Sequence, residues 1–376
     1  MYFHLILTDD CNLFCSYCRA KAFGEPEENG DENAPRIEID PDLPVELDFD
    51  LSLLYDFLTK DPSATLTFYG GEPLLRADLI DRIVREAPVQ RFMLQTNGLL
   101  LGRLSPEIVN RFKTILVSLD GREELTDANR GAGVYRNVME NIGKIRANGY
   151  AGEFIARMTV TERTDIVDAV HWLAQNPDYS FSSIHWQLDA NFAGDFSKRR
   201  FAEWVADRYN PGIRTLVTDW VDRMESFGEV QRWYPFLDPM DDLLQGHKSL
   251  LRCGSGHGNY SIMTDGHITP CPVMIGMSQY YLGHIRDANP LGLPLITVDG
   301  ECTDCRIRDF CGGRCLYSNI TKPWGTAERR LVCSTVENLY GALTDALPHV
   351  RALIENGTIT QVDFAHEKFN GCEIIP

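Results

Sequence analysis

The chain has 376 residues, 44% of them hydrophobic and 24% charged, a balance typical of one large globular domain or two ordinary ones rather than of a disordered or fibrous chain. Its formal net charge of -18 disfavours non-specific binding to nucleic acid or anionic lipid. No apolar run approaches the ~18 residues of a membrane span, and the first residues lack the parts of a signal peptide. We therefore expect a cytoplasmic protein with neither a nucleic-acid nor a membrane partner.

The first 235 residues alternate between predicted strands and helices. Short apolar runs predict strands at Phe3–Thr8, Thr65–Tyr69, Arg91–Thr96, Thr114–Leu119, Phe154–Val160 and Ser183–Leu188. Amphipathic stretches predict helices between them, for example at Asp78–Glu86, Asn137–Asn148 and Asp165–Gln175. Strands separated by helices favour βαβ crossovers and a parallel sheet. Six such units are too few for a closed eight-stranded barrel, so we predict an α/β fold, a partial (β/α)6 TIM-like barrel over residues 1–235.

The composition changes after the predicted barrel. Beyond Pro239 the chain is rich in Gly, Cys and Pro, which predicts a smaller domain over residues 236–340 whose core is partly replaced by metal ligation. A helix is predicted at Glu337–Ile354, within a C-terminal helix and tail over residues 341–376. Earlier in the chain, Glu25–Asp50 holds eleven acidic residues and one arginine. This segment is either a solvated loop or a lid or docking surface for a basic partner.

Eleven cysteines indicate metal ligation. Three occur in the first eighteen residues and seven fall between Cys253 and Cys333, with none in the long stretch that separates the two sets. The odd number and the lack of an export signal argue against a disulfide framework. Spacings of three and four residues allow several thiolates to converge on one metal or iron–sulfur centre.

The first set, Cys11, Cys15 and Cys18, forms a C-x3-C-x2-C motif directly after the first predicted strand. Three thiolates can hold three irons of a [4Fe–4S] cluster and leave the fourth iron open to a small chelating molecule. A zinc site would need a fourth ligand. With the aromatic Tyr17 before the last cysteine, the motif resembles the signature of radical SAM enzymes, and this resemblance extends over roughly residues 1–235.

The resemblance implies a set of contacts to S-adenosylmethionine (SAM). Gly70-Gly71-Glu72-Pro73 resembles the GGEP segment, whose carboxylate and backbone hold the methionyl amine of SAM. The resemblance implies that Arg157 pairs with the SAM carboxylate, and the guanidinium of an arginine suits such a bidentate contact. The remaining residues implied in binding the ribose, carboxylate or adenine are Thr96, Asn97, Ser118, Asp120, Gln187 and, through its backbone, Tyr17. Asp189 and His185 are candidates for a catalytic acid or base without an assigned role, and His185 is better explained as a packed or hydrogen-bonded core residue.

The second set of cysteines resembles the SPASM extension of radical SAM enzymes, which binds two auxiliary [4Fe–4S] clusters. By this resemblance the outer cluster takes four ligands, Cys302, Cys305, Cys311 and Cys333, and the inner cluster takes three, Cys253, Cys271 and Cys315. The cofactors would then be three [4Fe–4S] clusters and SAM. The inner cluster lacks one ligand, which Cys372 or His257 could supply, or its iron stays open for substrate.

The resemblance also implies a function. Members with a SPASM extension usually modify a peptide or protein side chain by crosslinking, oxidation or epimerisation, and this sequence is most similar to archaeal peptide-modifying members. We expect a peptide or protein substrate, basic in view of the negative charge, and an external one-electron donor of the flavodoxin or ferredoxin type. Because the sequence begins almost at the first predicted strand, we expect no peptide-recognition domain ahead of it. The alternatives are a radical SAM enzyme acting on a small molecule in haem or cofactor biosynthesis, and an electron-transfer or metal-storage protein without catalysis.

Overall fold

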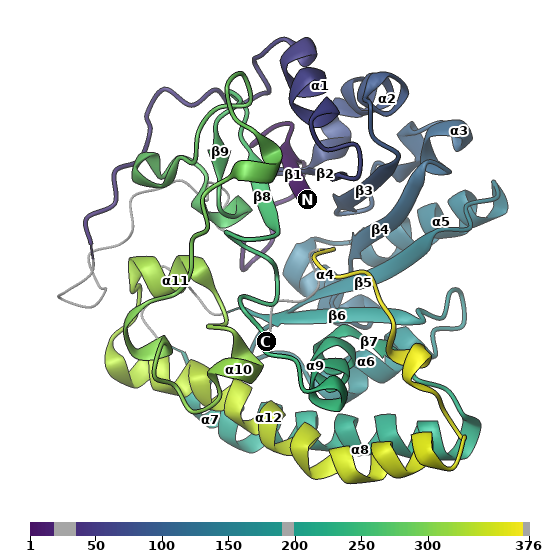
Figure 1. Ribbon diagram of the computed structural model, residues 1–376. Helices are drawn as coiled ribbons and strands as arrows, with labels where there is room; N and C mark the ends of the chain where they lie inside the picture. The colour runs from purple at the N-terminus through teal and green to yellow at the C-terminus, as the bar shows by residue number, and fades with distance from the viewer. Residues whose placement is uncertain (19–34, 190–198, 371–376) are drawn as a thin grey trace.

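The computed structural model describes residues 1–18, 35–189 and 199–370, which form one nine-stranded sheet and the helices around it (Figure 1). The strand order is β7-β6-β5-β4-β3-β2-β1-β8-β9, and neighbours are parallel except for the β8–β9 pair. The strand bounds are β1 Tyr2–Ile6, β2 Thr65–Tyr69, β3 Arg91–Thr96, β4 Phe112–Ser118, β5 Glu153–Val160, β6 Ser183–Leu188, β7 Arg232–Trp233, β8 Asn259–Ile262 and β9 Ile268–Thr269.

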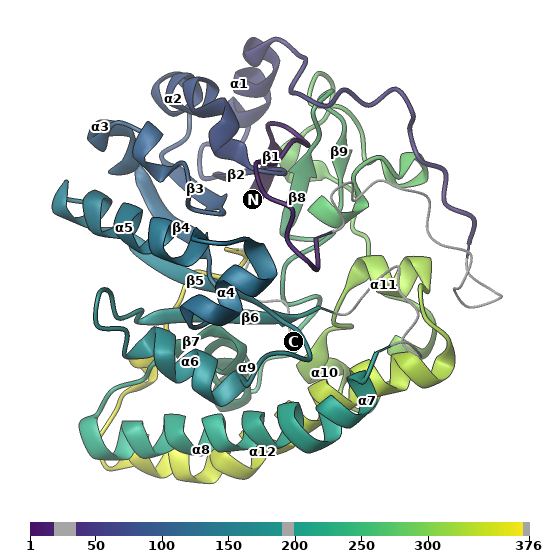
Figure 2. The same cartoon turned by 180° about the vertical axis from the view of Figure 1, so that it is seen from behind.

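Strands β1 to β6 lie side by side in chain order, and helices cover their outer face (Figures 1 and 2). This arrangement confirms the predicted α/β partial barrel. The predicted strand bounds agree with the structure to within two residues, the largest differences being at the end of β1 and the start of β4. The helix bounds are α1 Leu51–Thr59, α2 Ala77–Glu86, α3 Pro106–Val109, α4 Glu123–Arg130, α5 Val134–Ala147, α6 Ile166–Ala174, α7 Phe201–Trp204, α8 Asn210–Phe227, α9 Tyr234–Gln245, α10 Arg308–Cys311, α11 Leu316–Thr321 and α12 Thr326–Glu355.

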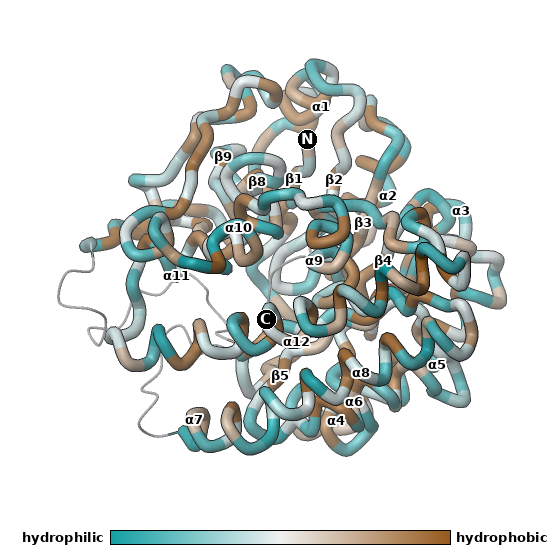
Figure 3. The backbone as a smooth tube through the Cα atoms, turned by 60° about the horizontal axis from the view of Figure 1, so that its bottom comes forward, coloured by the Kyte–Doolittle hydropathy of each residue, from teal (hydrophilic) through white to brown (hydrophobic). Residues whose placement is uncertain are grey.

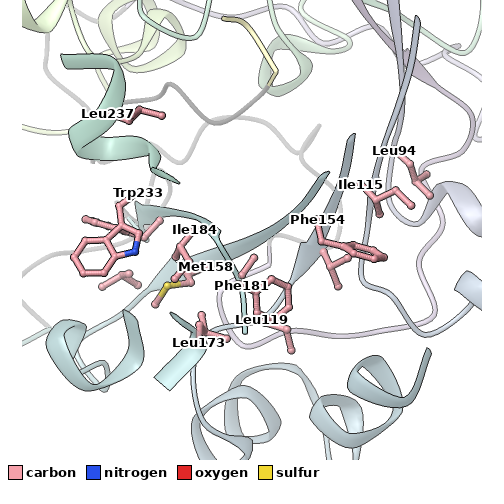
Figure 4. Close-up of a cluster of buried hydrophobic side chains, with 14 of the residues drawn as sticks. Leu94, Ile115, Leu119, Phe154, Met158, Leu173, Phe181, Ile184, Trp233 and Leu237 are labelled. Atoms are coloured by element: carbon pink, nitrogen blue, oxygen red, sulfur yellow. The ribbon is translucent and has the colours of Figure 1, made fainter. Parts of the chain in front are cut away.

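The two faces of the barrel strands have different chemistry because side chains alternate along a strand. In β5, Phe154, Ala156 and Met158 join the hydrophobic core between sheet and helices (Figure 4). The alternate residues Ile155 and Arg157 point to the other face, into the interior of the partial barrel. The outer face therefore builds the core, and the inner face is free to carry polar groups.

Helix α6 illustrates why the covering helices form where the sequence predicts them. The Asp165 carboxylate accepts hydrogen bonds from the backbone N–H groups of Val167 and Asp168, which caps the helix start. Its buried residues recur every three or four positions, so one face packs against the sheet (Ile166, Ala169, Val170 and Leu173).

The cysteine-rich region between α9 and α12 continues the barrel sheet. Strand β8 pairs in parallel with β1, with Asn259 opposite Tyr2. The rest of the region has short elements, close turns and a small hydrophobic cluster made of Leu251, Cys271, Met274, Met277, Val298 and Leu316. At Gly312 a Cβ atom would lie 1.4 Å from the Leu250 carbonyl oxygen, so this turn requires glycine.

Helix α12 differs from the prediction. It begins at Thr326 rather than at Glu337, carries Cys333, and crosses the domain boundary predicted at residue 340. It packs along α8 and runs in the same direction, with Asn338 hydrogen-bonded to Asn210 near the start of α8 and His349 beside Glu225 near its end, and hydrophobic and hydrophilic stretches alternate along both helices (Figure 3). Good helix formers such as Ala327 and Leu331 explain the earlier start, which the nearby glycines and cysteines concealed. None of the described helices is both long enough and apolar enough to cross a membrane.

The described part of the C-terminal tail lies at the amino-terminal ends of the barrel strands. The Tyr2 hydroxyl of β1 donates a hydrogen bond of 2.8 Å to Glu367, which also forms ion pairs with Arg91 of β3 and Lys113 of β4. Tyr2 also packs edge-on against the ring of Phe369. The tail thus reaches the barrel end opposite to the one at which the first cysteine motif begins.

Candidate functional site

The loop that carries the first three cysteines follows β1 at the carboxyl ends of the parallel strands. Burial raises the pKa of the Cys11 thiol, and the neighbouring Cys18 raises it further. Burial likewise raises the pKa of Cys15 to about 11, and the thiols of Cys18 and Cys11 add to the rise, which Arg130 opposes. The Cys18 backbone N–H donates to the Cys15 carbonyl over 2.9 Å. The structure therefore brings the three thiols together on one compact turn.

The segment after β2 fits tightly against this loop. The backbone N–H of Gly71 donates to the Thr8 carbonyl, and that of Glu72 donates to the Asp10 carbonyl. A Cβ atom at Gly70 would lie 2.2 Å from the Thr8 oxygen, and one at Gly71 would lie 2.3 Å from the Asp10 oxygen. Both positions require glycine, because any side chain would push the cysteine loop away from the strand ends.

The Glu72 carboxylate is buried and ties together the ends of β2 and β3. It accepts hydrogen bonds from the Thr96 hydroxyl at 2.7 Å and from the Asn97 backbone N–H at 2.7 Å. The Asn97 side-chain amide in turn donates to Asn12 and lies 3.9 Å from the Cys11 sulfur. Burial raises the pKa of Glu72, against the effect of these hydrogen bonds. Three of the residues predicted to contact SAM therefore meet beside Cys11.

Asp120 is the centre of a second buried network under the cysteine loop. Its carboxylate is fully buried and forms an ion pair with Arg130, with nitrogen–oxygen distances of 2.8 and 3.1 Å. It also accepts hydrogen bonds from the Tyr17 hydroxyl, the Asn129 amide and the Thr159 backbone N–H. Asp120 and Tyr17, predicted as SAM contacts, here hold the cysteine loop against β4 and β5.

The interior of the partial barrel carries the other predicted site residues. Arg157 donates to the Gln187 side chain over 2.9 Å, and its Nε is buried without a hydrogen-bond partner among the described residues. His185 neighbours Arg157 across the β5–β6 pair and is fully buried. Asp189 lies beyond β6, 3.5 Å from Arg199, and is not part of the buried interior. Ser118 pairs with Arg157 in the β4–β5 register.

His4 was not selected from the sequence, yet it faces the same interior from β1. Its ring lies 2.9 Å from the Asn259 oxygen, while the Asn259 amide nitrogen donates to the Cys253 carbonyl. That orientation makes Nδ1 of His4 the donor. Burial lowers the pKa of His4 to about 4, and the charge of Arg157 lowers it as well. No sequence motif marks His4, because only the β1–β8 pairing brings it to Asn259.

The three cysteines predicted for an inner cluster also come together. Burial raises the pKa of Cys271, and the nearby thiols of Cys315 and Cys253 raise it further. The Cys253 sulfur lies 3.1 Å from the Ser255 hydroxyl oxygen. Cys271 belongs to the small hydrophobic cluster of the second region and Cys253 packs against it, whereas Cys315 is buried at the start of α11.

His257 and Cys372 are the two residues predicted as a fourth ligand of this inner group. Nε2 of His257 lies 2.9 Å from the Leu251 carbonyl oxygen, so this nitrogen is already engaged. Cys372 lies outside the described residues. The described tail ends next to the loop after Cys253, because a Cβ atom on Gly254 would lie 2.6 Å from the Phe369 ring.

The four cysteines predicted for an outer cluster form a third group. Burial raises the pKa of Cys302, and the Cys305 thiol contributes. Burial raises the pKa of Cys311 to about 11, with contributions from the thiols of Cys333 and Cys302. Cys333 comes from the first turns of α12, so the early start of this helix places the fourth thiol. The ten described cysteines thus divide into groups of three, three and four.

Residues 5–173 match the sequence profile of the radical SAM superfamily. The chain contains a radical SAM domain. The matched segment holds the first cysteine group, the Gly70–Pro73 segment and the Asp120 network, so the geometry above belongs to that domain. The finer resemblance to archaeal peptide-modifying members stays a prediction.

Curated relatives match mainly this domain. The AdoMet-dependent heme synthase of Nitratidesulfovibrio vulgaris is 30% identical over 166 residues, which cover 41% of this chain and 39% of that protein. A probable GTP 3',8-cyclase of Halobacterium salinarum is 26% identical over 227 residues, 54% of this chain and 56% of that protein. The chain therefore spans between about two fifths and three fifths of the length of these relatives.

Solved structures match over more of the chain. The structure of native anSMEcpe with bound AdoMet and the Kp18Cys peptide has a TM-score of 0.66 at 17% identity and covers 94% of this chain and 99% of that chain. Streptococcus suis SuiB bound to the precursor peptide SuiA has a TM-score of 0.51 at 16% identity, covering 84% and 71%. At this identity the likeness shows a common fold, which includes the cysteine-rich region as well as the barrel.

A radical SAM domain implies a [4Fe–4S] cluster and SAM, and the residues present fit this pair. Cys11, Cys15 and Cys18 are the right donors in number and type, and the raised pKa values of Cys11 and Cys15 mean that a cationic metal centre is needed to hold these two as thiolates. Within the described part of the chain, no three His, Cys, Asp or Glu residues gather closely enough to hold a single metal ion. A four-iron cluster is larger than one ion and takes its ligands from further apart.

Proposed function

We propose that this protein is a radical SAM enzyme that abstracts hydrogen from a peptide or protein side chain and so modifies it after translation. The observation that carries the proposal is the division of the cysteines into one group of three inside the radical SAM domain and groups of three and four outside it. The second and third groups would hold two auxiliary [4Fe–4S] clusters in a SPASM-type domain.

The proposal gives separate roles to the residues at the strand ends and to those in the barrel interior. A cluster held by the first cysteine group, together with SAM, would supply a 5′-deoxyadenosyl radical that abstracts hydrogen from an unactivated C–H bond. Glu72 and Asn97 fix the position of Cys11, and the Asp120–Arg130 pair fixes Tyr17. The substrate would enter the barrel interior, where Arg157 and Gln187 provide hydrogen-bonding groups.

The fold supports a peptide as substrate, because two of the solved structures with the same fold were determined with peptides bound. The net charge of -18 favours a basic peptide segment as substrate. The external one-electron donor must have a contact surface that is compatible with a negatively charged partner. The acidic residues 25–34, part of the predicted docking segment, lie outside the described residues.

A small-molecule substrate is the second candidate, because the heme synthase and the cyclase match the radical SAM domain more closely in sequence. The two candidates are separated by offering the reconstituted, reduced enzyme with SAM either a library of basic peptides containing Cys, Ser and Thr or a set of porphyrins and purine nucleotides. A change in peptide mass together with 5′-deoxyadenosine release supports the peptide proposal. Turnover of a porphyrin or nucleotide alone overturns it.

The number of clusters is tested on the same protein. We expect about twelve irons and twelve sulfides per chain after anaerobic reconstitution, falling by about four in the Cys11→Ala, Cys15→Ala, Cys18→Ala triple variant. The triple variant also loses 5′-deoxyadenosine formation. The Cys372→Ala and His257→Asn variants then show which residue, if either, completes the inner cluster, through a changed electron paramagnetic resonance (EPR) signal. Two zinc ions and no response to SAM would contradict the whole proposal.

A further inference from the structure

Arg314 is a buried cation on the turn that joins the two auxiliary cysteine groups. It stands between Cys311 of the outer group and Cys315 of the inner group, and it is only 8% exposed. Its Nε and Nη1 atoms are buried and have no hydrogen-bond partner among the described residues. Its backbone φ of 55° is one that residues other than glycine rarely adopt, so this position is occupied by arginine despite the strain.

The other two arginines that are buried in the described part of the chain show what is unusual about Arg314. Arg130 is paired with the buried Asp120. Arg252 contacts both Asp238 and Asp242 and donates to the Phe310 carbonyl. Burying a charge without a counter-ion is strongly unfavourable, and these two arginines each have one. Arg314 has no carboxylate partner among the described residues.

The groups that do surround Arg314 are thiols and a phenol. Arg314 follows Cys311 by three residues, and its charge acts on the thiols of both Cys311 and Cys333. On another side lies the buried Tyr209, whose pKa is raised by burial and lowered by Arg314. Arg314 also lines a cleft of about 200 Å³ together with Cys302 and Cys333. The unpaired nitrogens therefore border the place where the outer thiols meet.

We propose that Arg314 is the counter-ion of the iron–sulfur cluster held by Cys302, Cys305, Cys311 and Cys333. A [4Fe–4S] cluster with four thiolate ligands is anionic and becomes more so when it gains an electron, so a buried cation beside it favours the reduced state. Arg314 would thus raise the potential of the outer cluster relative to the same cluster without a buried cation beside it.

This inference rests on the proposed iron–sulfur function, and the experiment keeps the two apart. Arg314→Met removes the charge, and Arg314→Lys keeps it. Arg306→Met is the matched control, because Arg306 follows Cys305 but is 77% exposed and paired with Glu337. Each full-length variant is reconstituted anaerobically and assayed for iron and sulfide, and its midpoint potentials are measured by EPR-monitored redox titration. The outer cluster is identified as the one lost in Cys333→Ala.

We expect Arg314→Met to disfavour the reduced outer cluster at least tenfold, which lowers its one-electron midpoint potential by at least 59 mV. Arg314→Lys should recover most of this change, and Arg306→Met should leave the potential almost unchanged. If Arg314→Met instead loses about four irons while Arg314→Lys keeps them, the need for a charge supports the same role.

An unchanged midpoint potential in a fully loaded Arg314→Met protein overturns the inference and leaves the proposed function intact. Equal iron loss in Arg314→Met and Arg314→Lys also overturns it, because the side chain would then matter for packing. Wild-type protein that binds only about four irons overturns the inference and the three-cluster proposal together.

Discussion

The barrel and the cysteine-rich region achieve a defined structure in different ways. The barrel has six successive parallel strands, each with one face in a continuous hydrophobic core that the covering helices complete. The cysteine-rich region has only a small hydrophobic cluster, and its chain is bent by turns such as the one at Gly312 and Gly313. The first region is therefore specified by burial and strand pairing, whereas the second has little burial of its own, and we expect metal ligation by its thiols to fix it.

Iron removal should give the largest effect and should separate the two regions. Small metal-stapled domains draw on the order of 10 kcal/mol from metal binding, so the segment 246–325 should lose its protection when iron is chelated, while the barrel keeps its own. Hydrogen exchange followed by mass spectrometry checks this on peptides from 253–321 and from 91–160. If chelation left the exchange protection of both segments unchanged, the small hydrophobic cluster would be sufficient to keep the cysteine-rich region folded without iron.

Replacing Arg130 by Met should be the most damaging single change in the barrel network. It leaves the Asp120 carboxylate fully buried without its cation, which costs about 3–5 kcal/mol of unfolding free energy. Arg136→Met is the control, because its ion pair with Glu123 is exposed and such pairs contribute only about 0.2–1 kcal/mol. Urea unfolding at neutral pH measures both, and similar losses in the two variants would argue against the role given to Asp120.

His4 tests the contact between the barrel and the cysteine-rich region, because it lies on β1 and is hydrogen-bonded to Asn259 of β8. The pKa of His4 is about 4 in the folded protein and 6.5 in the unfolded chain. Between pH 4 and pH 6.5 the unfolded chain therefore binds a proton at this residue and the folded chain does not. The stability should therefore fall as the pH drops from 6.5 to 4, by about 3 kcal/mol at most from this residue. His4→Gln should lose this part of the pH dependence, whereas the surface variant His349→Gln should keep it. Denaturant titrations at pH 7, 5.5 and 4.5 provide the comparison.

Much of the fold could be predicted from the sequence, because in the barrel local pattern and global structure agree. The runs that end at Tyr69, Thr96 and Leu188 are strands in the structure with the same last residue. Helix α12 was predicted only from Glu337 onward, since Gly325 directly precedes it and Cys333 lies in its first turns. Those turns contain good helix formers such as Ala327 and Leu331, and the packing of α12 on α8 supplies the stabilisation that an isolated helix lacks.

The site divides in the same way. The spacing of the ten described cysteines marked them as metal ligands, and the structure gathers them into three groups, whereas their role as ligands stays a prediction. The resemblance to radical SAM enzymes, not spacing, selected Glu72, Asn97 and Asp120, which meet beside or beneath the first group. The sequence could not select Arg130, His4 or Arg314, because nothing in a chain of residues shows which charge will be buried and which partner it will have.

By itself the sequence determined the order of the elements, the positions of the thiols, and the two glycines, Gly70 and Gly71, that allow close contact with the cysteine loop. These features depend on short-range geometry. Only the tertiary structure decided the rest: that β8 joins β1 and brings Asn259 to His4, that α12 carries Cys333 to the outer group, and that Arg314 is buried among thiols with no carboxylate partner in the described part of the chain. Burial and electrostatic pairing arise between residues that are distant in sequence, so they are fixed only when the chain has folded.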